Sequence, residues 1–169
     1  MSAPVFVDTI VLVYARDLRE KAKQPVAALW IAQLWRDRTG RTSAQVLSEF
    51  YVTVTRKLKP GMPAAQAWDE VNAFLSWHPQ AVDAALLQRA YQIEQRYRLS
   101  WWDSAVVGAA QLQDCALLLT EDLQDGAVFG SVTVRSPFTL AAEAPRAIYR
   151  LPPPENAHRP RGRPARKVR

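Results

Sequence analysis

Cysteine, histidine and long hydrophobic runs are scarce in this sequence, and each scarcity excludes a class of protein. The 169 residues include one cysteine, Cys115, so no intrachain disulfide can form, and its apolar neighbours indicate a buried thiol rather than a nucleophile. The two histidines, His78 at an expected helix end and His158 in the C-terminal segment, are interpreted as non-catalytic. No run reaches the roughly 20 apolar residues of a membrane span, and the start of the chain lacks the basic residues of a signal peptide. We therefore expect a cytoplasmic protein without a membrane segment.

Positive charge is concentrated at the C-terminus. Residues 150–169 contain seven of the 22 basic residues and one of the 16 acidic residues, so the net charge of +6 belongs to this segment and the rest of the chain is balanced. From about residue 141 the apolar periodicity is lost, and proline and arginine dominate. This composition predicts one domain over residues 1–140 and a basic tail over residues 141–169 that is disordered.

Short β-branched or apolar segments alternate with longer segments of helical periodicity. Strands separated by helices predict an α/β fold, a three-layer α/β/α sandwich with a central parallel sheet. The first strand is expected to turn into a helix near Leu12, and Ser43, Asp83 and Ser100 are expected to cap later helices. Other strands are predicted around residues 41–42, 115–120 and 130–136, and helices over residues 25–38, 44–58, 63–77, 84–98 and 100–113.

Four acids fall at or near the expected ends of these elements. Asp8 interrupts an apolar run, where a carboxylate is costly to bury without a partner, and Thr120 and Asp122 follow a buried strand. Ligands bind at the carboxyl ends of the strands in open parallel sheets, and Asp103 and Glu49, on helices, could reach the same edge. Converging carboxylates without matching arginines favour a divalent cation, and Mg²⁺ or Mn²⁺ prefers oxygen ligands.

Each acid also has a structural interpretation. Asp103 lies three residues after Ser100, as in a capping box. Glu49 fits a solvated helix position, and Asp122 fits a turn. Asp8 is the hardest to explain by structure alone, because its neighbours are otherwise apolar. The signals are weak singly and stronger together.

Four stretches that contain these acids resemble the PIN domain, in particular the VapC-type toxins of bacterial toxin–antitoxin pairs. They are FVDTIVLVYA, SAQVLSEFYVTVTRKL, LSWWDSAVVGAA and LLLTEDLQDG, and the resemblance spans about residues 4–140. It implies a metal-dependent ribonuclease with an acidic pocket. The resemblance places the metal-binding and catalytic roles on Asp8, Glu49, Asp103 and Asp122, with Thr120 orienting a metal-bound water or a phosphate oxygen.

Two positions depart from or extend this pattern. Many family members have a small polar residue two positions after the first aspartate, where this chain has Ile10, so a polar contact in the pocket is expected to be missing. Glu121, beside Asp122, is an alternative or additional metal ligand.

The function that the resemblance implies is a Mg²⁺-dependent (or Mn²⁺-dependent) endoribonuclease toxin. It would cleave an RNA substrate, be held inactive by a cognate antitoxin protein and form a homodimer. The alternative is a nucleic-acid-binding or regulatory PIN protein without cleavage, which would use its basic tail.

Basic residues supply candidate nucleic-acid contacts. Arg56 and Lys57, at the end of the helix that carries Glu49, could bind a phosphate backbone or could be solvated residues favoured by the helix dipole. In the tail, Arg161 and Arg163 lie in PRGRP, which resembles the AT-hook that enters the minor groove of A·T-rich DNA. Non-specific nucleic-acid attraction and a merely solvated tail remain alternatives to DNA contact.

Overall fold

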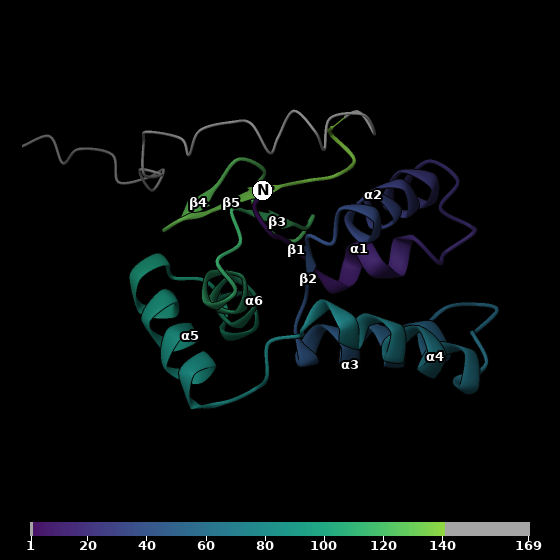
Figure 1. Cartoon of the computed structure of the whole chain (residues 1–169), viewed down its shortest axis with the longest axis horizontal. Coiled ribbons are helices and arrows are strands. Elements are labelled where there is room, and N and C mark those ends of the chain that lie inside the picture. The colour runs from purple at the N-terminus through teal and green to yellow at the C-terminus, as the bar shows by residue number, and fades with distance from the viewer. Residues whose placement is uncertain (1, 141–169) are drawn as a thin grey trace, which may run out of the picture.

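The computed structural model describes residues 2–140, in which five short strands form one sheet with helices around it (Figure 1). The sheet order is β2-β1-β3-β5-β4. β1 pairs in parallel with β2 and β3, β3 pairs in parallel with β5, and β4 is antiparallel to β5. The strands are β1 (Val5–Val7), β2 (Gly40–Arg41), β3 (Leu117–Leu119), β4 (Val128–Phe129) and β5 (Val132–Arg135).

Helices connect the parallel strands and cover the sheet. Because parallel crossovers are right-handed, the helices between β1 and β2 and those between β2 and β3 lie on opposite faces. Figure 1 shows α1 and α2 on one side of the strands and α5 and α6 on the other, which confirms the predicted α/β/α layers. The helices are α1 (Thr9–Tyr14), α2 (Lys23–Asp37), α3 (Ala44–Val52), α4 (Ala64–Phe74), α5 (Ala84–Tyr97) and α6 (Trp101–Leu112).

Local capping signals place most helix starts where the sequence predicts them. Ser43, Asp83 and Ser100 are the N-caps of α3, α5 and α6, and each side chain accepts a backbone N–H of the first turn. The prediction that the first strand turns into a helix near Leu12 is wrong, because Asp8 caps the helix and α1 begins at Thr9. The acid therefore lies at the junction of β1 and α1.

Two further details of the elements differ from the prediction. The helix expected over residues 44–58 is α-helical to Val52 and continues as a π-helix, Thr53–Lys57. The sheet is not wholly parallel, because the edge strand β4 forms an antiparallel hairpin with β5 around Gly130, whose φ is +62°. Only glycine adopts such a φ at little cost, so this residue permits the turn.

The core encloses the two central strands. Every residue of β1 and β3 is buried, and Trp30, Leu34 and Phe50 are among the buried side chains around them. Cys115 is also buried, and burial raises the pKa of its thiol to about 12, which leaves it an unreactive core residue as expected. Because both faces of the central strands are covered, a polar site can open only where these strands end.

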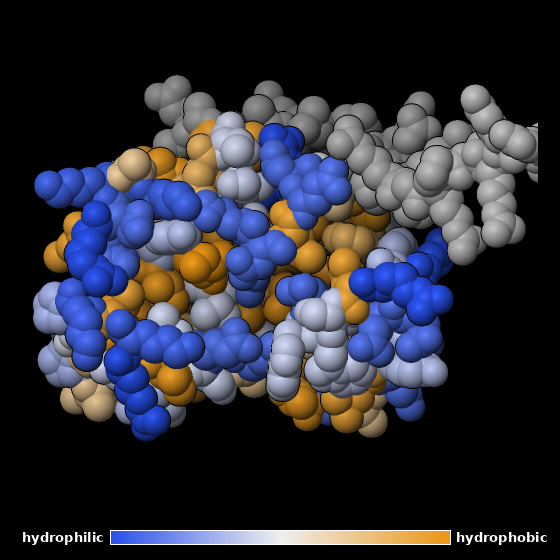
Figure 2. All heavy atoms as spheres, turned by 180° about the vertical axis from the view of Figure 1, so that it is seen from behind, coloured by the Kyte–Doolittle hydropathy of each residue, from blue (hydrophilic) through white to orange (hydrophobic). Residues whose placement is uncertain are grey.

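The surface of the described residues mixes polar and apolar side chains. On the face turned away from Figure 1, hydrophobic residues are interrupted by polar and charged ones (Figure 2). Within residues 2–140, no helix has the length and apolar character that a membrane span needs. The predicted tail, residues 141–169, lies outside the described residues.

Candidate active site

Asp8 is the buried centre of the candidate site. It follows β1 directly and is 7% exposed. The backbone N–H of Thr9 donates to Oδ1 at 2.7 Å, and the hydroxyl of Thr120 donates to Oδ2 at 2.8 Å. Both carboxylate oxygens are therefore held, one by the start of α1 and the other by the end of β3.

Burial dominates the electrostatics of Asp8. Desolvation raises the pKa of its carboxyl from the ordinary 3.8 to about 6, and the hydrogen bonds from Thr120 and Thr9 offset part of this effect. The negative charges of Asp122 and Glu49 raise the pKa further. A buried acid under repulsion from two neighbours has a strong electrostatic preference for a cation.

Thr120 connects the two strand-end acids. It is fully buried, its hydroxyl donates to Asp8, and the backbone N–H of Asp122 donates to its oxygen at 3.1 Å. The hydroxyl proton is thus engaged with a carboxylate. In this arrangement Thr120 holds both the Asp8 carboxylate and the turn that carries Asp122.

Asp122 is exposed at the end of β3, next to the other acids. Desolvation is the largest cause that raises the pKa of its carboxyl, followed by repulsion from Asp103, Glu121 and Glu49. These couplings place the four predicted acids within electrostatic reach of one another. We call Asp8, Glu49, Asp103 and Asp122 the acidic rim.

The two helix-borne acids of the rim are held by local contacts. On α3, the hydroxyl of Thr9 donates to Glu49 at 3.0 Å, and the side-chain amide of Gln45, one turn earlier, donates to its other oxygen at 3.0 Å. On α6, Asp103 and Ser100 form a reciprocal pair, with Asp103 N–H donating to Ser100 Oγ at 3.1 Å and that hydroxyl donating to Asp103 Oδ2 at 2.8 Å. Asp103 therefore takes part in the helix cap, and its charge also repels that of Asp122.

The site has a polar side chain near Asp8 although residue 10 is isoleucine. Its side chain is half-buried and packs against the core. The neighbouring Thr9 provides a hydroxyl, and this hydroxyl contacts Glu49. The site therefore has a polar side chain next to Asp8 at position 9, whereas position 10 is apolar.

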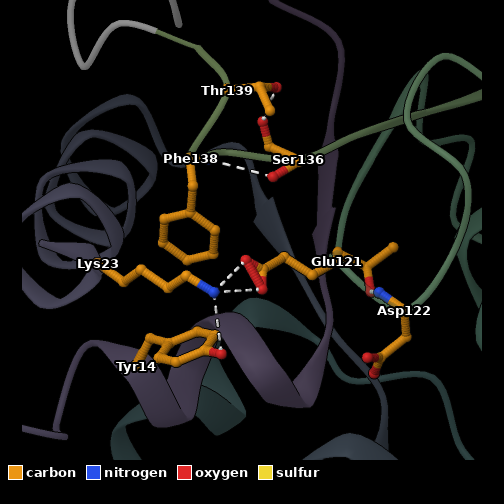
Figure 3. Close-up of polar contacts among 8 residues, drawn as sticks. Tyr14, Lys23, Glu121, Asp122, Ser136, Phe138 and Thr139 are labelled. Carbon is orange, nitrogen blue, oxygen red and sulfur yellow. Dashed lines mark hydrogen bonds and ion pairs between the residues drawn. The ribbon is translucent and has the colours of Figure 1, made fainter. Parts of the chain in front are cut away.

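Glu121 points away from the rim, which argues against it as a metal ligand. Its carboxylate is ion-paired with the amino group of Lys23, with Nζ–Oε distances of 2.6 and 2.8 Å. Figure 3 shows Glu121 extending toward Lys23 while Asp122 extends in another direction. The sequence contained no signal for this pair, because its members are far apart in the chain.

The donor chemistry of the rim suits a hard divalent cation. Its four carboxylates supply oxygen atoms only, and no described Lys or Arg is ion-paired with any of them. Among residues 2–140, however, no three Asp, Glu, His or Cys side chains stand close enough together to form a ready-made metal site. A cation would therefore have to draw the carboxylates of the rim closer together.

The predicted nucleic-acid contacts fall on two different parts of the chain. Arg56 and Lys57 are exposed in the π-helix that follows the helix of Glu49, and neither takes part in an ion pair of the described region. Arg161 and Arg163 lie outside the described residues. Trp102, beside Asp103, is 65% exposed, whereas Trp101 is half-buried.

The fold and the site together define a class of structure. It is an α/β fold with a mostly parallel sheet and carboxylates around the ends of β1 and β3. The PIN-domain family model matches residues 5–124, and the chain belongs to the PIN-domain family. Among solved structures, VapC20 of Mycobacterium tuberculosis, described as a sarcin-ricin loop cleaving toxin, is similar with a TM-score of 0.52. The identity is 21% over 68% of this chain and 86% of that one, and the likeness supports the fold. No curated protein sequence matches this chain.

Proposed function

We propose that this protein is a Mg²⁺-dependent endoribonuclease of the VapC toxin type. The observation that carries the proposal is the state of Asp8. In a PIN-family chain, this acid is buried at the end of β1, its pKa is raised to about 6, and two further carboxylates repel its negative charge. A carboxylate that is buried in this way, with no ion-pair partner among residues 2–140, is a strong candidate for metal binding.

The acidic rim would hold the ion. When bound, Mg²⁺ would lower the pKa of a water and neutralise charge that develops on the phosphate during phosphodiester hydrolysis. Asp8 would contribute from the N-cap of α1 and Asp103 from the first turn of α6, with Glu49 and Asp122 completing the oxygen donors. Thr120 keeps the Asp8 carboxylate in one orientation through its hydrogen bond.

The exposed basic residues of the π-helix would guide the substrate. Arg56 and Lys57 lie about two helical turns beyond Glu49 and have no ion-pair partner among the described residues. They could approach RNA phosphates while the rim engages the scissile bond. Because the structurally similar VapC20 cleaves the sarcin-ricin loop, a hairpin with that sequence is a suitable first substrate, beside unrelated structured RNAs.

Metal-dependent RNA cleavage by matched variants tests the catalytic proposal. We expect Asp8→Asn and Asp103→Asn each to reduce the cleavage rate by about 100-fold or more, because metal-ion stabilisation of a transition state is worth several kcal/mol. Asp83→Asn is the matched control, since it changes an aspartate that caps α5 and does not belong to the rim. Cleavage that persists in EDTA, or that is equal in all four proteins, would exclude this mechanism.

Expression in a bacterial host tests the toxin role and the partner. We expect the wild-type protein to arrest growth, Asp8→Asn to be tolerated, and a small protein encoded beside this gene to relieve the arrest as an antitoxin. Light scattering of the purified chain measures whether it is the homodimer that the family resemblance implies. Growth arrest that survives Asp8→Asn would point to a mechanism other than RNA cleavage.

A full chain compared with a deletion of residues 150–169 tests the role of the basic tail. We expect the deletion to weaken salt-sensitive retention on DNA and RNA and to leave the cleavage rate measurable. Retention without metal-dependent cleavage would favour the alternative, a nucleic-acid-binding PIN protein. If the two proteins are retained equally, the tail has no role in nucleic-acid binding, either in a ribonuclease or in a non-cleaving PIN protein.

A further inference from the structure

Two adjacent acids after β3 have opposite surroundings. Asp122 belongs to the acidic rim, whereas the Glu121 carboxylate ends at the amino group of Lys23 (Figure 3). Glu121 nevertheless precedes Asp122 directly in the chain, so its negative charge still repels that of Asp122. The rim therefore has a fifth carboxylate as a neighbour, and Lys23 is the side chain that compensates it.

Lys23 is held firmly enough to fix the position of Glu121. It is the first residue of α2, and its amino group lies 4.6 Å from the ring centroid of Tyr14 and 5.2 Å from that of Phe138. It also donates a hydrogen bond to the Tyr14 hydroxyl at 3.2 Å. The two rings pack edge to face, with centroids 5.2 Å apart. We call Tyr14, Lys23, Glu121 and Phe138 the Lys23 cage.

The cage joins three parts of the chain to the turn that carries the site. Tyr14 ends α1, the helix that Asp8 caps, and Phe138 lies on the segment after β5. Glu121 stands between Thr120 and Asp122, both of which take part in the rim's hydrogen bonds. The hydrogen bond to Glu121 is also the largest cause that raises the pKa of Lys23, so the amino group stays charged.

We infer that Lys23 is a positioning residue of the site: by holding Glu121 inside the cage, it keeps a fifth carboxylate away from the acidic rim. This inference rests on the proposed function, since it concerns the same metal and RNA. Without Lys23, Glu121 would be free to turn toward the rim. The added negative charge would attract Mg²⁺ more strongly and repel RNA phosphates.

Four variants and a catalytically inactive control test this inference. The variants are Lys23→Met, Lys23→Arg, Glu121→Gln and the double variant Lys23→Met/Glu121→Gln, beside the wild type, with Asp8→Asn as the inactive protein. Each is measured for the Mg²⁺ concentration at half-maximal cleavage and for the KM and kcat of an RNA hairpin. The shift of the melting temperature with Mg²⁺ is measured without RNA, and circular dichroism confirms folding.

We expect Lys23→Met to require about threefold less Mg²⁺ and to raise the KM for RNA about threefold, the size of effect that one partly exposed charge pair produces. Its melting temperature should also rise at lower Mg²⁺ concentration than that of the wild type. Lys23→Arg keeps the charge and should behave like the wild type. The double variant removes both charges, so it should return to within about twofold of the wild type.

The double variant decides between positioning and direct contact with RNA. If its KM stays as high as that of Lys23→Met, Lys23 acts on RNA itself and the inference is wrong. The inference is also wrong if Lys23→Met matches the wild type in its Mg²⁺ requirement and its melting shift. If the wild type does not cleave RNA but Lys23→Met still changes the Mg²⁺-dependent melting shift, the proposed function fails and the positioning role stands. If Mg²⁺ changes neither cleavage nor the melting temperature of any of these proteins, both the proposed function and the positioning role of Lys23 are wrong.

Discussion

The acidic rim and the Lys23 cage lie side by side and contain the same kind of side chain in two different states. In the cage, Glu121 has a cation within 2.6 Å, and that cation is enclosed by two aromatic rings. In the rim, Asp8 is more deeply buried than Glu121 and has hydroxyl and amide donors, but within residues 2–140 it forms no ion pair. Glu121 is therefore neutralised by a basic side chain, whereas no basic side chain among the described residues is ion-paired with the rim.

Asp8→Asn is expected to have the largest effect on stability in this comparison. The pKa of the Asp8 carboxyl is 3.8 in the unfolded chain and about 6 in the folded chain, so the folded chain binds its proton more tightly. The free energy of unfolding therefore falls as the pH rises from about 4 to 6 and folded Asp8 becomes ionised. Above pH 6 the ionised carboxylate lowers the free energy of unfolding by its full amount, up to about 3 kcal/mol for a pKa shift of this size. Asparagine can still cap α1 without carrying a charge.

Urea unfolding in EDTA measures this prediction. Asp8→Asn should be more stable than the wild type at pH 7.5, and most of the difference should vanish at pH 4. Asp83→Asn is again the control, since it changes a capping aspartate of α5 that lies outside the rim. A stability difference that is the same at both pH values would show that desolvation of the Asp8 charge is not its cause.

Thr120→Val is expected to have the second largest effect. Valine has nearly the same shape as threonine, so the fold keeps its packing, but Asp8 loses a donor and the N–H of Asp122 loses its acceptor. Leaving buried polar groups unpaired costs about 1–3 kcal/mol. Thr120→Ser retains the hydroxyl and should recover most of the loss in thermal melts, which distinguishes the hydrogen bonds from the lost methyl group.

Ser100→Ala tests the contribution of the cap that holds Asp103. The variant removes the N-cap oxygen of α6 and the hydroxyl that donates to Asp103, at an expected cost of about 1 kcal/mol. Ser100→Thr is the matched control because it keeps a capping hydroxyl. If melting temperatures do not distinguish alanine from threonine at this position, the cap contributes nothing to the stability of α6.

Lys23→Met is expected to have the smallest effect on stability, below about 1 kcal/mol, because the ion pair is partly exposed to water. Arg16→Met breaks another partly exposed ion pair, with Glu70, and provides the control. Similar small losses of unfolding free energy in both variants would agree with a cage that positions the Glu121 side chain rather than stabilising the fold. A loss of several kcal/mol in Lys23→Met alone would assign the cage a structural role.

Local signals explain why so many elements could be predicted. Capping depends on a few neighbouring residues, so Ser43, Asp83 and Ser100 marked their helices correctly. The β4 strand was missed because two residues carry no periodicity, and its pairing depends on the turn at Gly130. The start of α1 was misplaced because the apolar run continues past Asp8, and apolar periodicity alone cannot locate a cap inside such a run.

The sequence by itself determined the class of fold, because alternating apolar and amphipathic segments leave few ways to bury their surfaces, and it singled out Asp8 as an acid in an apolar run. The tertiary structure alone decided which acids face one another and which one is neutralised. Parallel pairing of β1 with β3 brings Asp8 to Thr120, and the packing of α1, α2 and the segment after β5 brings Lys23 to Glu121. These contacts join residues about a hundred positions apart, and only long-range packing can specify them.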